Sequence, residues 1–367
     1  MRILYYIYGL NIGGAETFIY SVLNCIDTNK YQIDLVLQSK ENSNRELLDL
    51  CVEKKVHIYY IPPFHRFPLQ NIKEIETILV RDNYDMIHVH QNAMINICPV
   101  IAAIRKDIPI VMHSHNSFSN AGRVGVILHK INRKKYASRV TRLSCGDEAG
   151  KWMYGNLDYK IINNAIDLDR YSYSYAFREE IRKKHKLDNN TKVIGHVGRF
   201  VPAKNHDFIL DIFRVLCKKM NDCVLLLVGD GELFSHINER VQTEGLSDKV
   251  ILTGNTVDAN KYYSAFDVLL FPSIFEGLPF TLVEAQAAGL KCVVSNNVTR
   301  SVNVTNSLDY LDVNSSVNEW AKKVKSCLET PRLRSELAEK MRGSVFDINY
   351  MIEDLEKVYD EIKGLKQ

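Results

Sequence analysis

The chain has 367 residues, of which 46% are hydrophobic and 25% are charged, and this size and composition predict a globular protein with two domains. A net charge of +3 is too small to indicate a nucleic-acid-binding protein, and no apolar run approaches the roughly 18 residues that would span a bilayer. The first eight residues precede a Gly-rich turn and predict a strand instead of a signal peptide, so we expect a cytoplasmic protein.

Short β-branched or aromatic runs alternate with longer helical segments in the first half of the chain, which predicts a mostly parallel sheet. The expected strands are residues 3–8, 33–37, 56–61, 86–90, 110–113 and 142–145, with helices such as 15–25, 74–82 and 96–105. The pattern pauses over residues 168–190, where only a short helix at 176–186 is expected. It resumes with strands at 193–197, 224–228, 250–253, 268–271 and 292–294, and an amphipathic helix covers 348–365. We therefore expect an α/β protein with two Rossmann-like domains, residues 1–170 and 171–347, and a C-terminal helix (348–367) that returns to the first domain.

The segment from residue 121 to Arg142 is basic and amphipathic. It contains seven Lys or Arg residues and no acidic residue, and apolar residues such as Val124, Ile127 and Ile131 recur at helical spacing. Such a helix can lie on an anionic membrane surface. The alternative is a solvated basic face beside an apolar stripe that belongs to the core. The sequence leaves both interpretations open.

A glycine-rich loop, residues 9–16, follows the first predicted strand and opens a helix. Its adjacent Gly13 and Gly14 would let the backbone approach a diphosphate at the helix N-terminus. The loop lacks the G-x-G-x-x-G pattern, and no acidic residue ends the second strand to hold a ribose. A nicotinamide-dependent enzyme is therefore disfavoured.

Two neighbouring strands end in histidines: His88 and His90 on one, His113 and His115 on the next, followed by Asn116. A histidine at a carboxyl end can bind a sugar hydroxyl or act as acid or base. Four histidines also suggest zinc, but no nearby carboxylate or cysteine completes a ligand set, and the eight cysteines show no C-x-x-C pair. If both strands alternate strictly, we expect His88 and His113 to point the opposite way from His90 and His115, and we favour His115 as the functional residue.

Two basic residues follow the strand at 193–197. Arg199 comes directly after Gly198, and Lys204 precedes the next helix. Fixed cations at this edge suit a leaving diphosphate, whose negative charge grows as its bond to the sugar breaks. The alternative is a pair of solvated loop charges.

The most specific segment is residues 271–289. Glu276 lies in the loop after a buried strand and Glu284 lies inside the following helix, which we expect Gly289 to end. The backbone amides from Gly277 through Leu278, Pro279 and Phe280 to Thr281 surround a helix N-terminus, although proline itself has no N–H. Carboxylates in such different settings suit different tasks, one toward sugar hydroxyls and one toward ribose hydroxyls.

These motifs together resemble glycosyltransferase family four, whose members are retaining enzymes with the GT-B fold. The resemblance rests on Glu276 and Glu284 at their spacing of eight, on Gly198-Arg199 with Lys204, and on Gly13-Gly14. It also includes the strand end at His115, residues 163–167, residues 229–231 and Gly254. It covers essentially the whole chain and is strongest for bacterial members that assemble capsular and exopolysaccharide repeat units.

The resemblance implies a fold and a set of roles. Two Rossmann-like domains would face each other across a cleft that holds the active site. Arg199 and Lys204 would bind the donor diphosphate, and Glu284 the ribose. Glu276 and the amides after it would hold the transferred sugar, His115 would contact that sugar, and Gly13 and Gly14 would lie under the phosphates. No protein nucleophile and no metal or other cofactor would be required.

We therefore expect transfer of a hexose or N-acetylhexosamine from a UDP-linked donor to a lipid-linked saccharide, by a cytoplasmic or peripheral membrane enzyme. The family's usual Asn-Gly-(Ile/Val)-Asp is Asn164-Ala-Ile-Asp167 here, and residues 296–300 replace a Gly-rich loop and are expected to help cover the donor. A UDP-sugar epimerase of the same plan and a non-catalytic nucleotide-binding protein are the alternatives.

Overall fold

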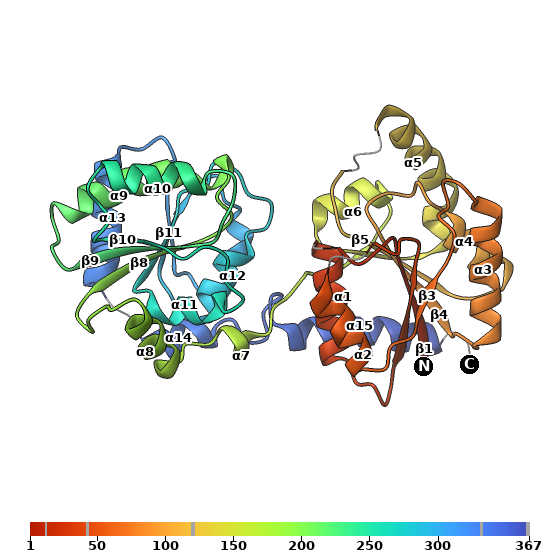
Figure 1. Cartoon of the computed structure of the whole chain (residues 1–367). Coiled ribbons are helices and arrows are strands. Elements are labelled where there is room, and N and C mark those ends of the chain that lie inside the picture. Colours follow the sequence, from red (N-terminus) through yellow and green to blue (C-terminus); the bar gives the residue numbers. More distant parts are fainter. Residues whose placement is uncertain (12, 42–43, 119–121, 331–332, 365–367) are drawn as a thin grey trace. The chain divides into compact units, whose positions relative to one another are not determined.

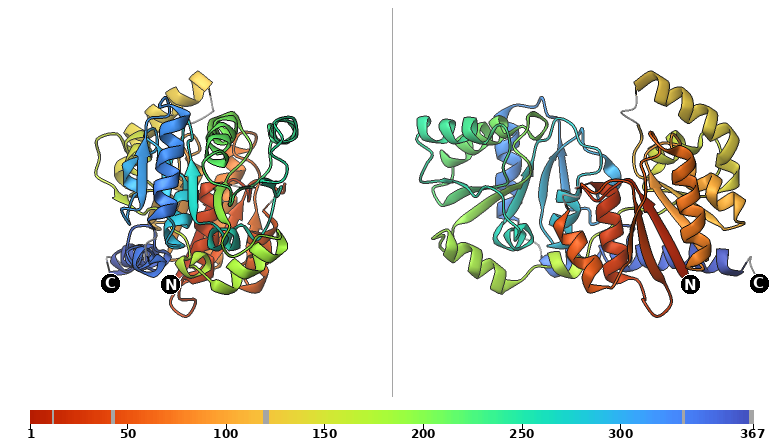
Figure 2. Two further views of the ribbon diagram at one scale, coloured as in Figure 1. Left: turned by 90° about the vertical axis from the view of Figure 1, so that its left-hand side faces the viewer. Right: turned by 45° about the vertical axis from the view of Figure 1, so that its right-hand side comes forward.

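The computed structural model describes residues 1–11, 13–41, 44–118, 122–330 and 333–364, and the chain divides into two compact units. Unit 1 contains residues 1–165 and the segment that begins at Ile348, and unit 2 contains Ile166–Asp347. In each unit, helices cover both faces of one parallel sheet (Figure 1 and Figure 2). The predicted α/β class with two Rossmann-like domains is thereby confirmed.

The sheet of unit 1 has the order β3-β2-β1-β4-β5-β6-β7, and each neighbouring pair is parallel. Its strands are β1 (Arg2–Ile7), β2 (Gln32–Leu37), β3 (Ile58–Tyr60), β4 (Met86–Gln91), β5 (Ile110–Ser114), β6 (Thr141–Ser144) and β7 (Lys160–Ile161). The chain order reverses between β1 and β4, which have β2 and β5 on their outer sides. Open α/β sheets bind ligands beyond the carboxyl ends of the strands at such a switch point.

Alternation along β1 divides the core of unit 1 into two layers. Ile3 and Tyr5 pack with α1, α2 and α15, whereas Leu4 and Tyr6 pack with α3 and α4 on the other face. The helices are α1 (Gly14–Cys25), α2 (Arg45–Glu53), α3 (Pro68–Arg81), α4 (Cys98–Arg105), α5 (Gly122–Tyr136), α6 (Asp147–Tyr154) and α15 (Ile348–Gly364), with the short turn η1 (Ala137–Arg139). The last helix thus contributes to the core of unit 1, and Tyr359 is fully buried there.

Unit 2 repeats this plan with a sheet of order β10-β9-β8-β11-β12-β13. Its strands are β8 (Lys192–Val197), β9 (Cys223–Val228), β10 (Val250–Leu252), β11 (Val268–Phe271), β12 (Cys292–Ser295) and β13 (Leu308–Leu311). Its helices are α7 (Leu168–Tyr171), α8 (Tyr175–Lys184), α9 (His206–Cys217), α10 (Phe234–Thr243), α11 (Ala259–Ala265), α12 (Phe280–Ala287), α13 (Val317–Glu329) and α14 (Arg334–Glu339), with the turns η2 (Pro202–Lys204) and η3 (Arg300–Val302). The switch point of this sheet lies between β8 and β11.

Candidate functional site

A pocket of about 590 Å³ lies at the carboxyl edge of the sheet in unit 1. Four of the predicted site residues line it together: Gly13, Gly14, His115 and Asn116. They come from the loop after β1 and from the end of β5, which the sheet order brings to the switch point. The sequence predicted each of these two segments as part of a site, and the order of strands in the sheet brings them together.

The glycine loop is held by two polar side chains. Gly13 is the N-cap of α1 without a side-chain cap, and the Glu16 carboxylate accepts a hydrogen bond from the Asn11 N–H at 3.3 Å. Asn164 donates from Nδ2 to the Gly14 carbonyl at 3.3 Å. A Cβ at Gly13 would lie 2.7 Å from the Glu16 carboxylate, so a side chain there would displace that contact. The neighbouring Ile12 lies outside the described residues.

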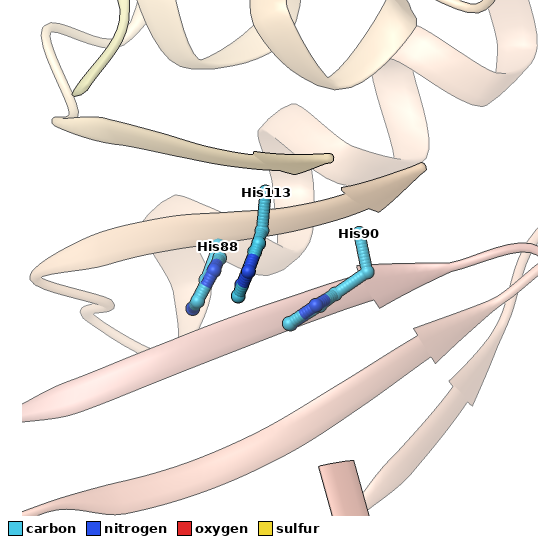
Figure 3. A group of neighbouring side chains, drawn as sticks. All are labelled: His88, His90 and His113. Atoms are coloured by element: carbon cyan, nitrogen blue, oxygen red, sulfur yellow. The ribbon is translucent and has the colours of Figure 1, made fainter. Parts of the chain in front are cut away.

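The histidines at the ends of β4 and β5 form one cluster. The ring centroids of His88 and His90 are 4.2 Å apart, and those of His90 and His113 are 5.8 Å apart (Figure 3). His115 joins them because its Nε2 lies 2.9 Å from His90 Nδ1. The expectation that these histidines point in opposite directions is therefore wrong. Residues two apart on a strand share a face, so His88 lies beside His90 and His113 beside His115.

All four imidazoles are neutral in the folded protein at physiological pH. Burial lowers the pKa of His115 to about 3, and burial next to other imidazoles lowers the pKa of His88, His90 and His113 well below 6.5. Within the described structure, His90 Nε2 and His115 Nδ1 have no hydrogen-bond partner. Both residues line the pocket, but these two nitrogens are themselves buried, so a ligand hydroxyl group would reach them only after the rings rotate.

Three of these side chains could also be considered as metal ligands. The candidate ligand atoms of His88, His90 and His113 lie within 4.8 Å of one another. Tetrahedral zinc holds nitrogens at about 2.0–2.1 Å, which places them about 3.4 Å apart. The rings of His88 and His113 are almost parallel, at 7°, so their lone pairs do not converge on one point (Figure 3). A zinc ion would require these rings to rotate.

In unit 2, the loop after β8 lies against the loop after β9. The Phe200 N–H donates to the Asp230 carbonyl at 2.9 Å, and Gly229 has a φ of +135°. A Cβ on Gly229 would lie 2.1 Å from the Gly198 carbonyl oxygen, so only glycine fits there. This close approach gives a structural reason for the glycines of residues 229–231. Gly254 belongs to the same edge, since its carbonyl accepts from the Gly229 N–H at 3.1 Å.

The two predicted cations differ in their surroundings. Arg199 is exposed and forms no ion pair with the carboxylates of the described residues. Lys204 instead pairs with Glu276, with 2.6 Å between Nζ and Oε1, and exposed side-chain fractions of 16% and 12%. The Ile274 N–H donates to the Ala203 carbonyl at 2.8 Å and thereby joins the two loops. The structure therefore brings a predicted phosphate ligand and a predicted sugar ligand into direct contact.

Glu284 lies on α12, which begins at Phe280 after Pro279 as N-cap. Its Oε2 accepts a hydrogen bond from the Tyr263 hydroxyl at 2.5 Å. Burial raises the pKa of Glu284 above its ordinary value, and hydrogen bonds from Tyr263 and Tyr171 act in the opposite direction. These tyrosines hold the carboxylate in place, and nothing in the sequence marked either of them as part of the site.

The N-terminus of α12 is open to ligands. Gly277 is exposed, Leu278 and Thr281 are half-buried, and a Cβ at Gly277 would meet nothing within 4 Å. The helix ends as predicted, because Gly289 has a φ of +66° and a Cβ there would lie 2.1 Å from the Arg334 carbonyl. The loop at 296–300 lies next to this segment, since Asn297 Nδ2 donates to the Ile274 carbonyl at 2.8 Å. Its expected contact with a donor stays a prediction.

Two family models match the chain, one in each unit. The model described as Glycosyltransferase Family 4 matches residues 12–170, and the model described as Glycosyl transferases group 1 matches residues 177–344. Together they account for most of the sequence and follow the division into two units.

Several curated proteins are similar over most of their length. EpsF of Bacillus subtilis (strain 168), named as a glycosyltransferase, is 26% identical over 98% of this chain and 96% of its own. The UDP-Gal:alpha-D-GlcNAc-diphosphoundecaprenol alpha-1,3-galactosyltransferase of Escherichia coli is 28% identical over 76% and 75%. CapH of Staphylococcus aureus, a capsular polysaccharide biosynthesis glycosyltransferase, is 24% identical over 98% of both chains.

Among solved structures, Anabaena HepE in complex with UDP superposes with a TM-score of 0.78 and 16% identity, over 98% of this chain and 100% of HepE. HepE in complex with UDP-glucose gives a TM-score of 0.70 and 18% identity over 98% and 100%. At these identities the likeness shows a shared fold, the GT-B fold.

Proposed function

The chain belongs to the glycosyltransferases of family four, and from that premise we propose that it transfers a hexose or N-acetylhexosamine from a UDP-sugar to a lipid-linked saccharide, with retention of configuration. The observation that carries the proposal is the set of groups at the carboxyl edge of unit 2. There Arg199, Lys204, Glu276 and the start of α12 follow adjacent strand ends. HepE binds UDP and UDP-glucose on the same fold, which supports UDP as the nucleotide.

In this proposal, Arg199 and Lys204 neutralise the diphosphate as its bond to the sugar breaks. Glu284 accepts hydrogen bonds from the ribose hydroxyls, and Glu276 with the amides of residues 277–281 holds the transferred sugar. The retained configuration would follow from attack by the acceptor hydroxyl on the face that the diphosphate leaves. A phosphate oxygen would receive the hydroxyl proton.

Unit 1 would supply the remaining groups. His115 and Asn116 line the pocket of unit 1 together with Gly13 and Gly14. We assign His115 to the transferred sugar and the glycine loop to the phosphates. We also propose that transfer needs no metal ion, because two cations and a helix N-terminus already provide positive potential for the diphosphate.

The acceptor part of the proposal rests on relatives. The name of the Escherichia coli relative specifies a diphosphoundecaprenol-linked sugar as its acceptor, and that of CapH specifies capsular polysaccharide biosynthesis. A lipid-linked acceptor would place this chain at the inner face of the cell membrane as a peripheral protein, in capsule or exopolysaccharide synthesis.

A thermal-shift screen in the presence of EDTA tests the donor assignment. A ligand at a hundred times its Kd stabilises the folded state by about 2.7 kcal/mol, so UDP should raise the Tm while GDP, ADP and CMP should not. Incubation of a stabilising UDP-sugar with lipid-linked acceptors, followed by NMR of the anomeric proton, then tests transfer and retention. Equal shifts with all nucleotides, or a shift only after addition of a divalent cation, would contradict the proposal.

A further inference from the structure

Helix α5 presents four aliphatic residues to solvent, whereas its His129 and Asn132 are buried. Val124, Ile127, Leu128 and Ile131 have exposed fractions of 80%, 59%, 40% and 59%. They recur at intervals of three and four residues and therefore share one stripe of the helix. The interpretation of this stripe as part of the core is wrong.

The buried face of α5 carries polar side chains because the loop between β4 and α4 needs hydrogen-bond partners at Met94. His129 Nδ1 accepts from the Met94 N–H at 3.0 Å, and Asn132 Nδ2 donates to the Met94 carbonyl at 2.8 Å. The His129 ring also stacks on Trp152, with 4.4 Å between centroids. These contacts fix the rotation of the helix about its axis, so the apolar stripe cannot turn inward without breaking them.

Basic residues border the exposed stripe. Arg123, Lys130 and Lys134 are exposed and lie seven and four residues apart, which places them along one flank of the helix. Lys135 is also exposed and lies four residues after Ile131, on the same side of the helix as the aliphatic residues. In the described part of the chain, none of these four forms an ion pair with a carboxylate, and no acidic residue occurs between Gly122 and Arg142. Figure 1 and Figure 2 show α5 at the outside of unit 1, part of it clear of the other helices.

We propose that this face of α5 is a docking surface for an anionic lipid bilayer. Four exposed aliphatic side chains with a cationic flank match an interface that offers acyl chains below and negatively charged headgroups above. Among the described helices, none has the length and apolar composition needed to cross a bilayer, and docking by α5 requires only that the helix lie along its surface. The inference deepens the proposed function, on which its purpose rests, since a lipid-linked acceptor is found at that surface.

Sedimentation with vesicles tests the proposal on the full chain. Wild-type protein should bind vesicles of phosphatidylcholine with phosphatidylglycerol and bind phosphatidylcholine alone much more weakly. Replacing three aliphatic residues (Val124→Ser, Ile127→Ser, Ile131→Ser) should weaken partitioning about 100-fold. Removing two charges (Lys130→Gln, Lys134→Gln) should weaken it about 30-fold, and raising the salt concentration should reproduce the effect of the charge removal.

Matched variants elsewhere in unit 1 serve as controls. Val52, Leu69 and Val80 have exposed fractions of 79%, 76% and 54%, so the triple serine variant removes similar apolar surface. Lys73→Gln with Lys106→Gln is the charge control, since both lysines are exposed. Controls should bind vesicles as the wild type does. Equal losses in control and α5 variants, no vesicle binding by the wild type, or self-association through α5 without vesicle binding would each overturn the proposal.

The same variants separate this inference from the proposed function. Stabilisation by UDP should be unchanged in every α5 variant, because the proposed ligands of UDP lie in unit 2 and in the pocket of unit 1, and α5 contributes no residue to that pocket. Intact UDP binding without vesicle binding refutes the docking surface alone. Vesicle binding without any response to nucleotides refutes the proposed donor alone.

Discussion

Replacing Glu276 by glutamine tests whether the diphosphate of the donor competes with Glu276 for Lys204. In the described structure the ammonium of Lys204 is engaged by this carboxylate at 2.6 Å. If Lys204 binds the diphosphate as proposed, the negatively charged diphosphate must bind beside the negatively charged carboxylate of Glu276. We therefore expect Glu276→Gln to tighten the binding of UDP, although it removes a proposed substrate ligand.

The size of this effect can be worked out from the ion pair. A phosphate oxygen on the far side of the ammonium would lie about 5 Å from the carboxylate, since an N–H···O bond to a charged group spans about 2.8 Å. Two unit charges at that separation repel by about 3 kcal/mol at an effective dielectric constant of about 20. Both side chains are partly exposed, 16% and 12%, so solvent screening should reduce this repulsion to about half. The remaining free energy corresponds to a change of about tenfold in Kd.

Isothermal titration calorimetry with UDP measures the outcome. Glu276→Gln should bind about tenfold more tightly than the wild type, Lys204→Met about tenfold more weakly, and the double variant should fall between them. Transfer from a UDP-sugar should be slower in all three variants. Glu180→Gln is the matched control because it breaks another ion pair of unit 2, with Lys261 at 2.8 Å. Unchanged or weaker UDP binding by Glu276→Gln would refute the competition.

Three further predictions concern stability and the ribose contact. Asp267→Asn should lower the free energy of unfolding in urea by about 3 kcal/mol, because it leaves the guanidinium of Arg182, 2.9 Å away and 2% exposed, without its counter-ion. The free energy of unfolding should fall as the pH drops below 6.5, because only the unfolded chain takes up protons on the clustered histidines. At pH 5.5 the fall should be about 1.4 kcal/mol for each clustered histidine. The fall should be less steep in His113→Phe. Glu284→Gln should weaken UDP binding about tenfold and leave pyrophosphate binding unchanged, as measured by calorimetry.

The sequence was sufficient to predict most strands, since a strand buried on both faces is a continuous apolar run bounded by turns. β9 (Cys223–Val228) and β11 (Val268–Phe271) are examples. The strands that escaped prediction lie at sheet edges, namely β7 (Lys160–Ile161) and β13 (Leu308–Leu311). Their short runs are half-exposed and resemble ordinary loops, and only their pairing with β6 and β12 makes them strands.

The candidate site was predictable as a set of segments, and its pairings were not. Sequence patterns place Lys204 and Glu276 after two different strands, but they do not show that a backbone hydrogen bond joins the loops and pairs the side chains. Helix α5 gives the same lesson, because periodicity reveals an apolar stripe without showing which side faces inward. The rotation of α5 about its axis is set by the backbone of Met94, whose N–H and carbonyl form hydrogen bonds with His129 and Asn132 and hold these side chains toward the core.

The neutrality of His115 has a consequence for the chemistry proposed. As the bond to the diphosphate breaks, positive charge develops on the sugar, and a protonated imidazole beside it would raise the barrier. Burial lowers the pKa of His115 to about 3, so the ring stays uncharged at every pH between about 5 and 8. We therefore expect the pH dependence of kcat to have the same shape in the wild type and in His115→Asn, with the rate of the variant lower throughout. A pKa near 6.5 that is present in the wild-type profile and missing from that of His115→Asn would show that this histidine titrates during turnover and that its proposed role is wrong.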